Sequence, residues 1–207
     1  MQFAKGKMVS VWETRVKDYM EFTQNTGHRQ PKNPLFPQTN NHPVVGVSKQ
    51  DAIAYCKWLT EKDRKADRIG PEHEYRLPTD KEWSQLCGLS DEKGENPAER
   101  YLQAQLDPSL RNTYPWGTVF PPRKKVANLA DTAAARAAGV KDDRVILNYN
   151  DGFVNTAAVG SLLPNKLGIH DLSGNVYEWI SDAYGPESDL DVARGGSWAS
   201  NNPSNLK

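Results

Sequence analysis

The long stretch from about residue 88 to 165 lacks a regular hydrophobic period. It shows neither the helical spacing of apolar residues nor the alternation of a half-buried strand. Turn-forming pairs such as Asp107-Pro108 and Pro121-Pro122 interrupt it, and only the alanine-rich segment 131–138 indicates a helix. Because unstructured loops of this length are uncommon inside compact domains, specific devices must order the stretch, and a bound metal would serve.

The composition agrees with an irregular backbone anchored by large side chains. The 207 residues include 15 Gly, 14 Pro and 6 Trp, and 37% are hydrophobic. That mix is untypical of a helix bundle and favours loops held by aromatic residues. The length suits one core, so a single domain over residues 1–207 is expected.

Charge and apolar runs weigh against several functional classes. Lys+Arg and Asp+Glu both number 26, which gives a net charge of zero. Without a basic stripe, no nucleic-acid partner is expected. No apolar run approaches the ~18 residues of a bilayer span, so no membrane insertion is expected. Residues 1–7 lack the apolar core of a signal peptide, so a cytoplasmic location is expected unless an export signal lies upstream.

Three helix starts are visible before the irregular stretch. Thr14 is a plausible N-cap for a first helix. Ser48 is expected to cap a second helix over about 49–63. Thr79 and Glu82 form a capping-box sequence, in which each side chain accepts from the backbone N–H of the other residue.

Short strands are expected near both ends of the chain. These pieces alternate or run apolar over a few residues and are bounded by turn signals. The expected strands are 8–12, 167–170, 175–179 and 192–198.

The two cysteines, Cys56 and Cys87, lie in expected helices near Trp58 and Trp83. Free cysteine packs as a small hydrophobe, so both are expected to be reduced core residues. A disulfide between them is the alternative. Their separation does not match a metal-ligand spacing.

Four segments, in order, resemble the formylglycine-generating enzyme (sulfatase-modifying-factor) family. The most specific are Arg-Leu-Pro-Thr at 76–79 and Gly-Asn-Val-Tyr-Glu-Trp at 174–179. His-Pro-Val-Val at 42–45 precedes them, and Arg-Gly-Gly-Ser-Trp at 194–198 follows. The similarity covers almost the whole chain.

The resemblance implies an α+β fold of the C-type-lectin-like kind. The family form is irregular and loop-rich, with two main helices packed on small antiparallel sheets. It also implies that the domain continues past Trp198 into further strands. A truncation at the C-terminus is therefore expected, because the chain stops at Lys207.

The resemblance further implies structural calcium at a first site in residues 171–178. The ligands map onto the side chains of Asp171 and Glu178 and the carbonyls of Gly174 and Val176. Calcium takes six to eight oxygens and mixes carboxylates with carbonyls in this way. From residue types alone, an alternative is that Glu178 pairs with Arg194 and Asp171 only caps a turn.

A second calcium site is implied on either side of the alanine-rich segment. It maps onto the side chains of Asn128 and Asp151 and the carbonyls of Leu129 and Phe153. The insertion between Asn128 and Asp151 is where this chain departs most from the family pattern.

The catalytic position of the family is altered in this chain. Family enzymes oxidise a substrate cysteine by means of two thiols that bind one copper ion. The matching positions hold Ser200 and Asn205. Neither can form the soft thiolate that Cu(I) prefers, so no catalytic residue and no copper are expected.

Two functions remain open. The first is a calcium-stabilised, non-catalytic module that binds a protein or a small ligand, because such folds present variable loops on a rigid base. The alternative is a divergent protein-modifying oxidoreductase related to the enzymes that convert sulfatase cysteine to formylglycine.

Overall fold

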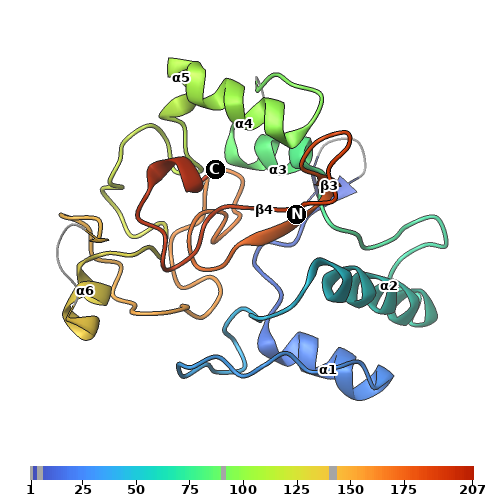
Figure 1. Ribbon diagram of the computed structural model, residues 1–207. Coiled ribbons are helices and arrows are strands. Elements are labelled where there is room, and N and C mark those ends of the chain that lie inside the picture. The colour runs from blue at the N-terminus through green and yellow to red at the C-terminus, as the bar shows by residue number, and fades with distance from the viewer. Residues whose placement is uncertain (1, 4–6, 90–91, 140–143) are drawn as a thin grey trace.

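A small antiparallel sheet lies at the centre of the protein (Figure 1). In this computed structural model, residues 2–3, 7–89, 92–139 and 144–207 are described. The sheet pairs β3 (Glu178–Ala183) with β4 (Asp191–Arg194), and Trp179 lies opposite Ala193. Figure 1 shows α1 and α2 on one side of this sheet and the helices α3 to α5 on another.

The first two helices pack against each other and extend away from the sheet. They are α1 (Val16–Thr26) and α2 (Lys49–Lys65). The α1 N-cap is Arg15 and makes no side-chain capping bond, so the expectation that Thr14 caps it is wrong by one residue. Ser48 caps α2 as predicted, in a reciprocal capping box. Lys49 ties α2 to β3, because its ammonium donates to two carbonyls of that strand.

The helix α3 (Asp80–Cys87) begins at the predicted capping box. The Thr79 hydroxyl accepts from the Glu82 amide at 3.1 Å, and Glu82 accepts from the Thr79 amide at 2.9 Å. Asp80 is fully buried and forms ion pairs with arginines from α4 and β4, so α3 is joined to both elements.

The irregular stretch contains more helix than its pattern predicts. The unexpected helices are α4 (Pro97–Leu106) and α5 (Pro108–Arg111). Arg100 and Ala104 are buried on α4, whereas Leu102 and Leu106 are exposed. Because an arginine is buried and leucines are exposed, α4 lacks the apolar stripe by which an amphipathic helix is usually predicted. The alanine-rich helix is confirmed as α6 (Thr132–Ala138).

The strands are shorter than expected and shifted. Segment 167–170 is not a strand, β3 starts only at Glu178, and residues 195–198 lie beyond β4. Asn175 has a φ of 58°, in the left-handed region that no extended strand occupies, so the chain turns before β3. At the N-terminus, β1 (Gln2–Phe3) pairs with β2 (Lys7–Met8), and most of 8–12 is irregular.

Among the described residues, buried apolar side chains form two core clusters. The first surrounds fully buried Trp83, and the second surrounds Leu129. Cys87 lies in the first cluster, as predicted, but Cys56 is only half-buried on α2, so that expectation is wrong. Both thiols are free, which excludes the disulfide in this structure.

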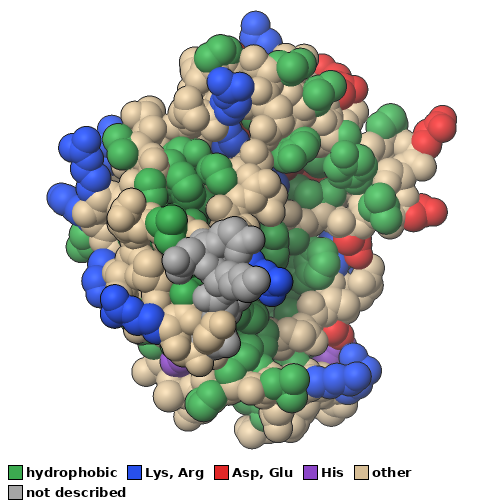
Figure 2. All heavy atoms as spheres, turned by 60° about the vertical axis from the view of Figure 1, so that its left-hand side comes forward, with side chains coloured by type: hydrophobic (Ala, Val, Ile, Leu, Met, Phe, Trp, Pro, Cys, Tyr) green, Lys and Arg blue, Asp and Glu red, His purple; other side chains and the backbone are tan. Residues whose placement is uncertain are grey.

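Short elements leave much apolar surface accessible. Figure 2 shows one face on which hydrophobic side chains gather, with Lys and Arg more frequent than Asp and Glu. Leu163 and Leu147 are both about half exposed, each in an irregular segment. Within the described residues, none of the helices has the length and apolar content to cross a bilayer.

Candidate functional site

Asp171 is a buried carboxylate with one unused oxygen. Its side chain is 3% exposed, and its Oδ2 accepts from the Gly160 amide at 2.9 Å. Its Oδ1 has no hydrogen-bond partner among the described residues. Burial raises the pKa of Asp171 because the charged form loses its hydration. The alternative that Asp171 only caps a turn leaves this second oxygen unexplained.

Glu178 is held by an indole rather than by an arginine. The Trp83 Nε1 donates to Glu178 Oε2 at 2.5 Å. Burial raises the pKa of Glu178 to about 7, and the charge of Asp171 adds to the effect. Arg194, its neighbour in the sheet register, pairs instead with Asp80 and Glu92. The alternative of a Glu178–Arg194 pair is therefore wrong for this structure.

Glu13 joins these two carboxylates, although the sequence did not single it out. Burial raises the pKa of Glu13 well above its ordinary range, and the charges of Asp171 and Glu178 raise it further. Its carboxylate accepts from Asn175 Nδ2 at 2.6 Å and from the Val176 amide at 3.2 Å. More than 150 residues separate Glu13 from its partners, so no local pattern could reveal it.

The predicted second site is also buried and rich in acceptors. Asn128 is 1% exposed, and its Oδ1 has no partner among the described residues. Asp151 is 2% exposed, and its two oxygens accept from the Leu129 and Phe153 amides at 2.8 and 2.7 Å. Burial raises the pKa of Asp151, and the charge of buried Asp131 adds to this.

The two predicted sites touch through a glycine. The backbones of Asn128 and Gly174 form an isolated β-bridge. Gly174 has a φ of 81°, and a Cβ there would meet the Asn128 carbonyl oxygen at 2.1 Å. Only glycine allows both that conformation and that approach. The structure thus places the segments of both predicted sites side by side.

The oxygen ligands of the two predicted sites suit calcium better than they suit a metal that is bound only by side chains. Nowhere in the described ranges do three or more His, Cys, Asp or Glu side chains converge as a metal cage. Calcium also accepts amide and backbone carbonyl oxygens, which complete a set with few carboxylates. Buried acceptors without partners are costly, and Asp171 Oδ1 and Asn128 Oδ1 are such atoms. The residues present therefore fit a hard cation.

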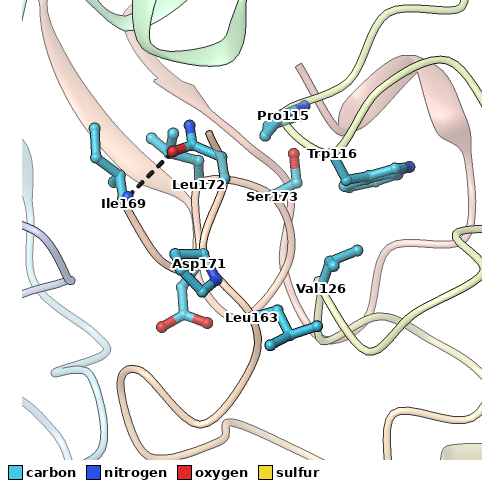
Figure 3. A pocket seen from close by; sticks show the side chains of 10 residues that line it. Pro115, Trp116, Val126, Leu163, Ile169, Asp171, Leu172 and Ser173 are labelled. Carbon is cyan, nitrogen blue, oxygen red and sulfur yellow. Dashed lines mark hydrogen bonds between the residues drawn. The ribbon is translucent and has the colours of Figure 1, made fainter. Parts of the chain in front are cut away.

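A small cavity beside this region is too narrow for a ligand. Its volume is about 10 Å³, enough for roughly one water. Figure 3 shows Pro115, Trp116 and Val126 around it, while the Asp171 carboxylate points away from Pro115 and Trp116.

The positions that match the family thiols lie close together around Gly196. A Cβ on Gly196 would meet Ser200 Oγ at 3.0 Å and the Asn205 carbonyl oxygen at 2.9 Å. Ser200 is buried, and its Oγ accepts from the Ser197 amide at 3.0 Å. Asn205 is exposed and ends a short 3-10 helix, η2 (Pro203–Asn205).

A hollow of about 340 Å³ opens beside Asn205. Its volume falls within the usual range of small-ligand pockets. Tyr101, Tyr177 and Tyr184 line it, and each is between 44% and 49% exposed. Tyr177 is the sequence neighbour of predicted ligands Val176 and Glu178, but the described lining of the hollow includes none of the predicted ligands.

The profile of the sulfatase-modifying factor enzyme 1-like (FGE-sulfatase) domain matches residues 5–207. The chain belongs to this family. Its loop-rich fold, with helices beside a small antiparallel sheet, is the fold expected from that membership. The family domain therefore extends over nearly the whole chain, including the segment with Ser200 and Asn205.

Two relatives from Mus musculus illustrate the range of the family. The chain is 33% identical over 158 residues to "Inactive C-alpha-formylglycine-generating enzyme 2", covering 75% of this chain and 37% of that protein. It is 31% identical over 174 residues to "Formylglycine-generating enzyme", covering 77% and 36%. The chain thus spans little more than a third of the length of these relatives.

Solved structures show the same fold at low sequence identity. PvdO from Pseudomonas aeruginosa superposes with a TM-score of 0.57 at 21% identity, covering 94% of this chain and 69% of that one. Treponema denticola variable protein 1 gives 0.54 at 19% identity, covering 94% and 73%.

Proposed function

We propose that this domain is a calcium-stabilised, non-catalytic binding module of the formylglycine-generating-enzyme family. The observation that carries the proposal is the presence of Ser200 and Asn205 where the family enzymes have copper-binding thiols. Hydroxyl and amide groups do not replace thiolates for Cu(I). Similarity to a relative named as inactive supports the same interpretation.

The remaining thiols do not compensate for this loss. Cys87 is buried and Cys56 half-buried, on two different helices. Burial raises the pKa of Cys56 to about 11 and that of Cys87 well above its ordinary value. The thiolate is the nucleophile and metal ligand, so these protonated thiols are poor substitutes.

Calcium would contribute to this function by ordering loops of the domain, and it would take no part in a reaction. The Asp171 and Glu178 side chains would hold it at the first site with the Gly174 and Val176 carbonyls, and Glu13 would fix the Val176 peptide through its amide. At the second site, the ligands would be Asn128, Leu129, Asp151 and Phe153. A bound cation would neutralise buried carboxylates and stiffen the loops beside the tyrosine-lined hollow.

We propose the hollow beside Asn205 as the binding surface. Tyrosine side chains offer ring faces and hydroxyls with little conformational freedom to lose, which suits them to recognition. The partner would be a small ligand or a protein segment that reaches Tyr101, Tyr177 and Tyr184.

A divergent protein-modifying oxidoreductase is the second candidate. It is favoured by the 31% identity to a relative named "Formylglycine-generating enzyme". In that case residues other than Ser200 and Asn205 would carry the chemistry.

The deciding experiment supplies Cu(I), oxygen and a Cys-x-Pro-x-Arg peptide to the wild-type protein and to the S200C/N205C variant. The wild type is expected to leave the peptide thiol intact and to take up no Cu(I). The double variant is expected to bind one Cu(I), which shows that the scaffold still presents both positions. Aldehyde formation by the wild type, detected by mass spectrometry, would favour the oxidoreductase.

A further inference from the structure

Asn175 lies between the two predicted cation sites and is a ligand of neither. It is fully buried, with a φ of 58°. Its Oδ1 accepts from Asn128 Nδ2 at 3.0 Å and from the Ala157 amide at 2.8 Å. Its Nδ2 donates to Glu13 Oε2 at 2.6 Å. One amide side chain therefore contacts Asn128 of the second site and Glu13, a carboxylate beside the first site.

Two of these contacts bear on predicted ligands, directly at Asn128 and through Glu13 at Val176. Asn128 Nδ2 also donates to the Asn155 carbonyl at 2.8 Å, so both of its protons are used and its Oδ1 is the free acceptor. The Glu13 carboxylate receives N–H groups from Asn175 and from Val176, whose carbonyl is a predicted ligand. Such supporting hydrogen bonds set the direction in which a metal ligand points.

The backbone links the same groups. The Asn175 amide donates to the Asn128 carbonyl at 2.8 Å. Gly174 packs so closely on Asn128 that a Cβ would overlap the backbone. A cation that moved Asn128 would therefore move Asn175, and with it the hydrogen bond to Glu13. Packed groups of this kind shift together rather than one by one.

We propose that Asn175 is a shared positioning residue that couples the two cation sites, so that they bind calcium as one unit. The inference rests on the calcium role in the proposed function. Two sites coupled in this way are linked by a coupling free energy. Occupation of either site therefore raises the calcium affinity of the other by the same factor. The hydrogen-bonded chain Asn128–Asn175–Glu13 carries that coupling.

The test is a calcium titration by calorimetry of four proteins: wild type, N175D, D171N and N175D/D171N. N175D keeps the size and the tolerance for positive φ but lacks the donor to Glu13. The calcium affinity that remains in D171N is that of the second site, because Asp171 is a predicted ligand of the first. An N96D variant, at the N-cap of α4, is the matched control and is expected to leave both affinities unchanged.

Wild type is expected to bind two calcium ions, and N175D to weaken both sites by about tenfold or more. D171N is expected to weaken the second site in the wild-type background and not in the N175D background. Weakening of the first site alone by N175D, or an unchanged second site in D171N, would overturn the coupling. If N175D does not fold, N175G removes all the side-chain hydrogen bonds of Asn175 and tolerates the backbone conformation.

Failure of the coupling and failure of the calcium role give different results. Two independent calcium sites in wild type would overturn the coupling and leave the calcium role intact. No calcium uptake by wild type would overturn both, while the thiol argument from Ser200 and Asn205 would stand.

Discussion

The loop with Asp171 and Glu178 and the loop with Ser200 and Asn205 are neighbours with opposite chemical character. They are joined by hydrogen bonds, including the Gly174 amide to the Gly195 carbonyl at 2.8 Å. In the first, buried Asp171 and half-buried Glu178 have raised pKa values, and Asp171 Oδ1 has no hydrogen-bond partner in the part of the chain that is described. In the second, the buried Ser200 oxygen already accepts a backbone N–H.

This contrast separates two predicted tasks, a structural cation site and a copper-binding thiol pair. Groups suited to a structural cation are retained in one loop, while thiols suited to copper are absent from the next. The backbone around Gly196 keeps the matched positions together even without sulfur. A fold of this kind therefore does not depend on its catalytic thiols, which is why function must be argued from the site.

The largest expected effect comes from G174A, which tests the close contact between the two cation sites. The added Cβ would overlap the Asn128 carbonyl oxygen, in addition to the cost of a φ of 81°. Unfolding free energy is expected to fall by about 4 kcal/mol or more, measured by denaturant titration in a chelator so that metal does not contribute.

The matched control is G27A at the end of α1. Gly27 has a φ of 70°, but a Cβ there meets no atom within 4 Å. The control is expected to cost only about 1–2 kcal/mol, the price of the left-handed conformation. Equal losses for the two variants would contradict the close approach of Gly174 to Asn128.

Removal of calcium by a chelator is expected to have the next largest effect on stability. This effect should depend on Asp171 and not on Ser200. At a calcium concentration one hundred times the dissociation constant, each site adds about 2.7 kcal/mol to stability. A chelator is therefore expected to lower Tm by about 5–10 °C per site, and calcium to restore it. The shift should shrink in D171N and stay the same in S200A. An unchanged Tm in the presence of chelator would count against both predicted calcium sites.

The smallest effects concern the second loop. S200A removes the acceptor for the Ser197 amide in a buried place, so a loss of about 1–2 kcal/mol is expected. N205A changes an exposed side chain and is expected to stay within about 0.5 kcal/mol. Thermal melts of both variants check this order, and the reverse order would mean that Asn205 has a structural role.

Local sequence patterns predicted the parts of the fold that depend on nearby residues. The N-cap at Ser48 and the capping box at Thr79 are formed by residues a few positions apart. The helix α4 was not predicted from the sequence, because its buried face carries Arg100, whose charge is paired with Asp80 from α3. A pattern of apolar residues cannot report a helix that buries an ion pair.

The strand predictions were only partly right for a related reason, since β3 and β4 overlap the expected strands 175–179 and 192–198 but 167–170 is not a strand. Residues 175–179 alternate as a strand does, but close contact with Asn128 and the left-handed backbone of Asn175 keep residues 175–177 outside β3. Register and strand ends depend on partners distant in the chain, which a local pattern does not contain.

By itself, the sequence determined the family, the helix starts and the absence of sulfur at positions 200 and 205, because each depends on residue identity or short spacing. Only the tertiary structure revealed that Glu13 joins Asp171 and Glu178, and that Asn175 lies between the two predicted sites. Those relations link residues far apart in the chain, and folding alone brings their side chains within hydrogen-bonding or Coulombic range.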